Sequence, residues 1–146
     1  MEKKSVLFLC TGNSARSQMA EAFLKKWAGD QLDVYSAGLE PSVVNPYTIE
    51  VMEEVGYDLS DQWSKSLREY DDRTFDYMVT VCSHAEENCP TGAVAVETRI
   101  FLPFEDPAAF EGTEEEKLNK FREIREQVEL DLRRLLEEDV FAISVS

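Results

Sequence analysis

The sequence predicts an α/β fold, a four-stranded parallel sheet with helices on both faces, in one domain that spans residues 1–146. Three observations support this prediction. Short apolar or β-branched segments alternate with longer segments of helical periodicity, as in parallel sheets whose crossovers are helices. A chain of 146 residues has the length of one domain, and 43% hydrophobic residues can supply a packed core. No repeat, Pro/Gly-rich linker or break in composition divides the sequence.

A buried strand and an amphipathic helix are expected first. The apolar run Val6–Leu9 predicts a strand over Ser5–Cys10. A helix is predicted over Ser17–Trp27, and Gly29 should end it, since glycine is common just past a helix end. Its apolar face toward the sheet is expected to contain Ala20, Phe23, Leu24 and Trp27.

A second strand and a second helix follow. The strand is predicted over Asp33–Ser36 and ends at Ala37-Gly38. The helix has Asn45 as its capping residue, Pro46 at its first position and Gly56 beyond its end. Its apolar residues Ile49, Met52 and Val55 are expected to face the core.

The second half of the sequence predicts two more strands and a long helix. Tyr77–Cys82 is rich in β-branched and aromatic residues, and a fourth strand is expected near Val96–Phe101. The helix should begin at the capping box Thr113-Glu114-Glu115-Glu116 and extend to about Glu138. Its apolar stripe consists of Leu118, Phe121, Ile124, Val128, Leu132 and Leu135.

The charge balance excludes several classes of partner. Fifteen basic and 30 acidic residues give a net charge of −15, which argues against nucleic acids and anionic membranes. No apolar run approaches the ~20 residues of a membrane helix. The apolar stretch after Met1–Lys4 is too short for a signal peptide and lacks a small-residue cleavage site. A cytoplasmic protein, monomeric by default, is therefore expected.

The sequence contains three cysteines, Cys10, Cys82 and Cys89, and one histidine, His84. An odd number of cysteines without an export signal favours reactive or buried thiols over a disulfide framework, and zinc-site spacing is absent. Cys10, Cys82 and the loop after the fourth strand all follow strand ends. Because ligands of such sheets bind at the carboxyl ends of the strands, these segments are expected to meet at one edge.

The segment Cys10–Ser17 has the composition of an oxyanion-binding loop between a strand and a helix. Such a loop directs backbone N–H groups toward a tetrahedral anion. Gly12 permits unusual backbone geometry, and the Arg16 guanidinium can bind two oxygens. The same positive field predicts a depressed pKa for Cys10, which would make it a good nucleophile. The residues expected to bind the anion are Thr11, Gly12, Asn13, Ser14, Ala15, Arg16 and Ser17.

The alternative for these residues is structural. Cys10 would then be a buried thiol at a strand end and Arg16 a surface charge. Cys82 would be a core thiol and Cys89 an isolated surface thiol. Asp106, which stands before a proline, would belong to a simple turn.

The stretch Val6–Glu21 resembles the first segment of the thioredoxin-coupled arsenate reductases, which share the fold of the low-molecular-weight protein tyrosine phosphatases. The resemblance implies an enzyme that reduces arsenate to arsenite for arsenic detoxification, with thioredoxin as reductant and no cofactor. It extends over nearly the whole chain, through Tyr35–Gly38, Val81-Cys82, Cys89-Pro90, Phe104–Ala108 and Gly112–Lys117.

The resemblance also implies a mechanism. Cys10 attacks arsenic while Asp106 donates a proton to the departing oxygen. Cys82 then attacks Cys10 and releases arsenite, and Cys89 attacks Cys82 to move the disulfide to where thioredoxin reaches it. Because Cys82 cannot serve both partners in one rigid arrangement, the polar segment 83–88 is expected to be a loop that moves. Glu105 is expected to be a bystander and His84 to be solvated.

Two departures from the family pattern affect the site. Ala15 replaces a second cysteine that family members often have in the loop. Some members also bind potassium through residues that match Asn13, Glu21, Ser36 and a carboxylate at position 65. Position 65 is Lys65 here, so no bound metal is expected, because the ammonium group can replace the cation.

Two other functions stay open. A phosphotyrosine phosphatase typically has proline where this sequence has Gln18, and aromatic residues where Ala108-Ala109 follow Asp106-Pro107. A non-catalytic oxyanion sensor would use Cys10 as a redox switch and would not need an acid such as Asp106.

Overall fold

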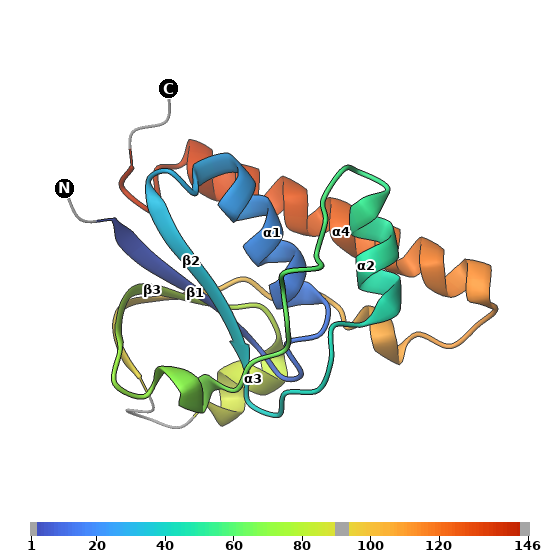
Figure 1. Cartoon of the computed structure of the whole chain (residues 1–146), viewed down its shortest axis with the longest axis horizontal. Coiled ribbons are helices and arrows are strands. Elements are labelled where there is room, and N and C mark those ends of the chain that lie inside the picture. The colour runs from blue at the N-terminus through green and yellow to red at the C-terminus, as the bar shows by residue number, and fades with distance from the viewer. Residues whose placement is uncertain (1–2, 90–93, 144–146) are drawn as a thin grey trace.

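The computed structural model describes residues 3–89 and 94–143, which contain a parallel sheet of four strands (Figure 1). The strand order is β2-β1-β3-β4, so β1 and β3 are central. The predicted sheet is thereby confirmed. Its strands are β1 (Lys4–Cys10), β2 (Leu32–Gly38), β3 (Thr74–Thr80) and β4 (Ala95–Phe101).

The helices cover the sheet on both sides, as predicted. Helices α1 (Arg16–Ala28) and α4 (Glu114–Glu137) pack together on one side, where α2 (Pro46–Glu53) lies against α4 (Figure 1). On the other side, Tyr70 of the 3-10 helix η1 (Leu67–Tyr70) packs edge to face against Phe75 of β3. The short α3 (Ser83–Asn88) follows β3 at its carboxyl end. None of the helices described here is long and apolar enough to cross a membrane.

The expected helix ends are confirmed where capping residues marked them. The Asn45 side chain accepts a hydrogen bond of 2.9 Å from the Tyr47 amide at the start of α2. Thr113 and Glu116 form the reciprocal capping box of α4, at 3.2 and 3.0 Å. The apolar stripe of α4 is buried from Phe121 to Leu135, and Leu118 is only partly covered.

The expected apolar face of α1 is confirmed, since Ala20, Phe23 and Leu24 are buried and Trp27 is partly covered. Burial extends to every residue from Arg16 to Leu24, because the helix packs against the sheet, α4 and the segment around Trp63. Two expectations for the elements were wrong. In α2, Met52 is buried but Ile49 and Val55 remain exposed. Segment 83–88 is a helix and not a loop, because Ala85 is buried among core residues.

An ion-pair cluster joins α2 to α4 at the surface. Glu54, the residue after α2, accepts hydrogen bonds from Arg122 at 3.0 and 2.6 Å and from Arg125 at 2.9 Å. The hydrogen bonds from Arg122, and to a smaller extent those from Arg125, lower the pKa of Glu54 to about 2.

Candidate active site

The loop between β1 and α1 has the shape of an anion cradle, and Asn13 sets its conformation. Asn13 has a φ of 49°, in the left-handed region. Its side chain is fully buried, donates to Ser17 Oγ at 2.8 Å and accepts from the Lys65 amide at 2.8 Å. The expected role of Gly12 was wrong, since its φ is not positive and an added Cβ would meet its nearest atoms only at 3.6 Å.

Gly38, at the end of β2, is required beneath this loop. Cys10 pairs with Gly38 in the sheet register. A Cβ at Gly38 would lie 2.6 Å from the Thr11 carbonyl oxygen and 2.9 Å from the Asn13 amide nitrogen. Such approaches to backbone atoms cannot be relieved by a rotamer change, so only glycine fits here. The sequence predicted that a strand ends at Gly38, but it did not predict this close approach to the backbone of Thr11 and Asn13.

Arg16 is a buried residue of the site and not a surface charge. Its side chain is only 10% exposed, and Nη1 donates to the Phe104 carbonyl oxygen at 3.0 Å. Nη2 lies 3.9 Å from an Asp106 oxygen. Nε is buried and has no hydrogen-bond partner. Because buried donors are almost always paired, this N–H is available for an anion oxygen.

The carboxyl ends of the strands surround a cavity of about 420 Å³. The structure thus brings together residues that the sequence marked as separate candidates, Thr11, Arg16, Cys82 and Asp106. Cys10 lies beside them with 3% exposure. Glu40 was missed, because nothing in its local sequence distinguishes it from other surface carboxylates. The residues that line the cavity are Thr11, Arg16, Glu40, Cys82, Ser83, His84, Phe104 and Asp106.

The Cys10 and Cys82 sulfurs form a hydrogen-bonded pair. This hydrogen bond and burial raise the pKa of Cys10. The same hydrogen bond lowers the pKa of Cys82 to about 5, with help from the Thr11 hydroxyl at 3.3 Å, the Ala85 amide at 3.4 Å and the Arg16 charge. The Arg16 charge and the Thr11 amide act in the opposite direction and lower the pKa of Cys10, as the sequence led us to expect. The Cys82 sulfur thus has two hydrogen-bond partners besides Cys10, the Thr11 hydroxyl and the Ala85 amide.

Cys82 and Cys89 stand at the two ends of α3. Cys82 caps the helix with its sulfur, and the half-buried Cys89 follows its last residue. Seven helical steps separate their Cα atoms by roughly 10 Å, which exceeds the ~7 Å limit for a disulfide. Bond formation between these sulfurs therefore requires α3 to unwind. His84, on α3, is exposed as expected. Pro90, the next residue of the resemblance, lies outside the described residues.

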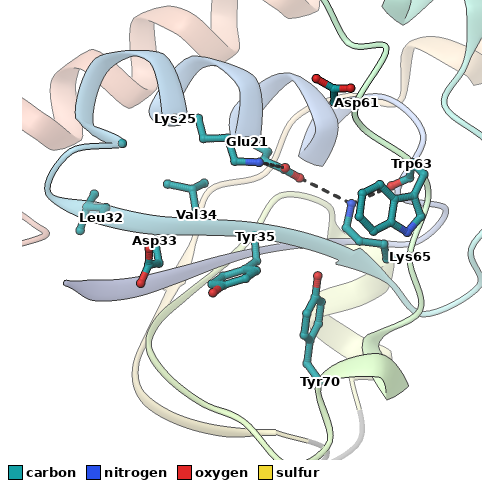
Figure 2. A pocket seen from close by; sticks show the side chains of 11 residues that line it. Glu21, Lys25, Leu32, Asp33, Val34, Tyr35, Asp61, Trp63, Lys65 and Tyr70 are labelled. Atoms are coloured by element: carbon teal, nitrogen blue, oxygen red, sulfur yellow. Dashed lines mark hydrogen bonds and ion pairs between the residues drawn. The ribbon is translucent and has the colours of Figure 1, made fainter. Parts of the chain in front are cut away.

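The four positions that match a potassium site in some family members converge here. Lys65 Nζ lies 3.7 Å from a Glu21 oxygen (Figure 2). The same oxygen accepts a hydrogen bond from the Ser36 hydroxyl. The Lys65 side chain is 5% exposed, donates to the Trp63 carbonyl at 2.6 Å and lies over the Trp63 ring. Burial lowers the pKa of Lys65. An ammonium group here does not fit beside a potassium ion, because the two cations repel each other.

Comparison with known proteins agrees with this geometry. The family model described as low molecular weight phosphotyrosine protein phosphatase matches residues 5–140. An arsenate reductase from Halalkalibacterium halodurans is 47% identical over 88% of this chain and 91% of its own. The structure of an arsenate reductase in the phosphate binding state has a TM-score of 0.73 and 36% identity, and covers 92% of this chain and 98% of that chain.

A third relative indicates the electron donor of its own reaction. The thioredoxin-dependent arsenate reductase of Corynebacterium glutamicum aligns over 97% of this chain and 64% of that chain, with 30% identity and a TM-score of 0.69. Together, the strand–loop–helix that cradles an anion, the sheet order and the extent of the match show that this chain belongs to the low molecular weight phosphotyrosine protein phosphatase family.

Proposed function

We propose that this protein is an arsenate reductase that converts arsenate to arsenite, is reduced by thioredoxin and acts in arsenic detoxification. The observation that supports it most directly is the hydrogen-bonded pair of sulfurs, Cys10 and Cys82, beside the anion cradle. A phosphatase uses one sulfur as nucleophile, whereas a reductase needs a second sulfur within reach to supply electrons. Relatives over nearly the whole chain are named arsenate reductases. The thiols fit a reducing compartment, the cytoplasm.

The first chemical step joins arsenic to Cys10. Arsenate binds to the backbone amides of the loop and to the Arg16 guanidinium. Cys82 takes the Cys10 proton along their hydrogen bond, and its low pKa lets it lose that proton again at neutral pH. The Cys10 sulfur attacks arsenic, and the oxygen that leaves takes a proton from Asp106 and departs as water.

The second step reduces arsenic. The Cys82 thiolate attacks the Cys10 sulfur, the sulfur–arsenic bond breaks, and its electron pair stays on arsenic. As(V) thereby becomes As(III) and leaves as arsenite, while Cys10 and Cys82 are oxidised to a disulfide. After α3 unwinds, Cys89 attacks Cys82 and releases the Cys10 thiolate. The thioredoxin dithiol then reduces the Cys82–Cys89 disulfide and is itself oxidised.

Phosphotyrosine is a poor fit for this cavity. Among the described residues, its lining contains a single Phe, Tyr or Trp side chain, Phe104, which is 7% exposed, while Glu40 and Asp106 are exposed carboxylates there. Gln18 replaces the proline that is typical of that class and is fixed by hydrogen bonds to the Asn13 and Trp63 carbonyls. Phosphatase activity is therefore expected only as a weak side reaction of the shared cradle.

The proposed function is tested by following NADPH loss with arsenate, thioredoxin and thioredoxin reductase. Continued arsenate-dependent oxidation is expected, and Cys82→Ser should abolish it. A phosphatase would give none, and a redox sensor would give at most one turnover. A Cys82→Ser variant that still cycles would contradict the relay.

A further inference from the structure

We propose that Lys120 is a positioning residue for Asp106, because its ammonium group holds both sides of the turn that carries this carboxylate. The inference rests on the proposed function of Asp106 as the acid. Lys120 lies on α4, outside the oxyanion loop and outside the cavity lining.

The turn begins just beyond the ends of β3 and β4, where hydrogen bonds fix the backbone. Phe104, just before it, donates its amide to the Val81 carbonyl at 3.0 Å, and its own carbonyl accepts from Arg16. Asp106 then starts the 3-10 turn η2 (Pro107–Ala109), and Phe110 follows it. Beyond Phe104 the backbone leaves the sheet and crosses toward α4, which η2 contacts.

Lys120 binds the residue before this turn and the residue after it. Its Nζ lies 2.8 Å from a Glu105 carboxylate oxygen and 5.8 Å from the centre of the Phe110 ring. The Lys120 side chain is only 15% exposed, whereas that of Glu105 is 61% exposed. A partly buried cation thus holds the two flanks of Asp106 against α4. Glu105, which was expected to be a bystander in the chemistry, forms one end of this contact.

The Asp106 carboxylate depends on the turn for its direction. Its Oδ1 accepts a hydrogen bond of 2.9 Å from Ala108 inside the turn itself. Its Oδ2 is 3.9 Å from Arg16, which is too long for a hydrogen bond. Half of the side chain is exposed, so packing does not fix its rotamer. A turn of three residues is marginal by itself, and external contacts must fix its position.

The expected effect is on rate more than on stability. An ion pair whose carboxylate is mostly exposed contributes little to the free energy of unfolding. A proton donor that is displaced by an ångström, however, can lower a rate by as much as about 100-fold. A merely structural lysine would lower thermal stability and activity together, whereas a positioning lysine would lower activity alone.

The test compares Lys120→Met with Glu123→Gln, which removes the other carboxylate near the same ammonium, at 3.4 Å, without touching the turn. In Lys120→Met we expect kcat/KM for arsenate to fall about 10-fold, with the inhibition constant of inorganic phosphate and the Tm nearly unchanged. Lys120→Arg should restore most of the rate, Glu105→Gln should reproduce the loss, and Glu123→Gln should behave as wild type. Equal losses in Lys120→Met and Glu123→Gln, or no loss in either, would overturn the inference.

Asp106→Asn separates this inference from the proposed function. If Asp106 is the acid, Asp106→Asn lowers kcat/KM about 100-fold or more, and Lys120→Met added to it changes nothing further, because there is no acid left to position. Wild-type kcat/KM in Asp106→Asn would refute the acid. A low rate in Asp106→Asn with additive loss from Lys120→Met would refute only the positioning role.

Discussion

The Thr11 hydroxyl lies 3.3 Å from the Cys82 sulfur, so the residue that follows Cys10 in the anion cradle also contacts the second sulfur of the proposed relay. Thr11 directly follows β1 and Cys82 follows β3, and the parallel pairing of these strands brings both residues to the same edge of the sheet. A substitution of Thr11 in the cradle should therefore change the pKa of Cys82 and with it the proposed thiol relay.

Thr11→Val should raise the pKa of Cys82. With the hydroxyl present, the thiolate is expected to titrate near pH 5, and its fraction falls as the pH is lowered through that value. Loss of one hydrogen bond should move the midpoint upward by roughly one pH unit. Thiolate absorbance near 240 nm measures the midpoint in a Cys89→Ser background. Ser83→Ala, which changes another hydroxyl of the cavity lining, is the matched control. A wild-type midpoint near that of free cysteine would contradict the assignment.

Gly38→Ala should inactivate the enzyme, while Gly12→Ala should be tolerated. The added methyl at position 38 would press on the backbone of Thr11 and Asn13 and displace the cradle, whereas at position 12 it meets only ordinary contacts. We expect kcat/KM for arsenate to fall about 100-fold for Gly38→Ala and little for Gly12→Ala. Phosphate affinity, measured by calorimetry, should fall in parallel. The reverse order of the two variants would show that the loop requires glycine at position 12.

The sequence predicted the strands and long helices because local signals define them. Each of these signals lies within a few residues of the element that it predicts. They are the short apolar runs of the strands, the Thr113 capping box and the Asn45-Pro46 helix start. Segment 83–88 was predicted wrongly for the same reason. Its polar composition is local, whereas the burial of Ala85 that supports α3 depends on β1 and β3.

The site was predictable in its members but not in its electrostatics. The spacing of Cys10 and Arg16 between a strand and a helix indicated the cradle. The hydrogen bonds that the Cys82 sulfur makes with Cys10, Thr11 and Ala85 lower its pKa, and no sequence pattern predicts these contacts. The contact of Lys120 with Glu105 likewise joins α4 to the loop before η2, and no local sequence pattern predicts it.

Glu54→Gln should make the protein less stable at neutral pH but not at pH 2. The folded-state pKa of Glu54 lies near 2, below its usual value of 4.5. The stabilisation is thus present above about pH 4.5 and is lost as the pH falls through 2. Because the group is one third exposed, solvent screening limits the effect, and we expect the Tm at pH 7 to fall by about 3 °C. Differential scanning calorimetry at both pH values measures this. Glu53→Gln, the neighbouring exposed carboxylate, should have no such effect, and an equal loss at pH 2 would exclude the ion-pair explanation.

Lys65→Asp should make the stability depend on potassium. The substitution places a second carboxylate beside Glu21, near Ser36 and Asn13, where family members that bind potassium have one. Without the ion the two carboxylates repel each other and lose a buried partner, which costs about 3 kcal/mol. Added potassium would then stabilise the folded state by mass action. Thermal unfolding in potassium chloride against choline chloride measures the difference. Lys65→Met has neither the ammonium group of the wild type nor the carboxylate of Lys65→Asp at this position. It should be destabilised, but its stability should not respond to potassium. Wild-type protein should respond equally to both salts, and a potassium-specific rise in its Tm would show that the Lys65 ammonium does not replace the cation.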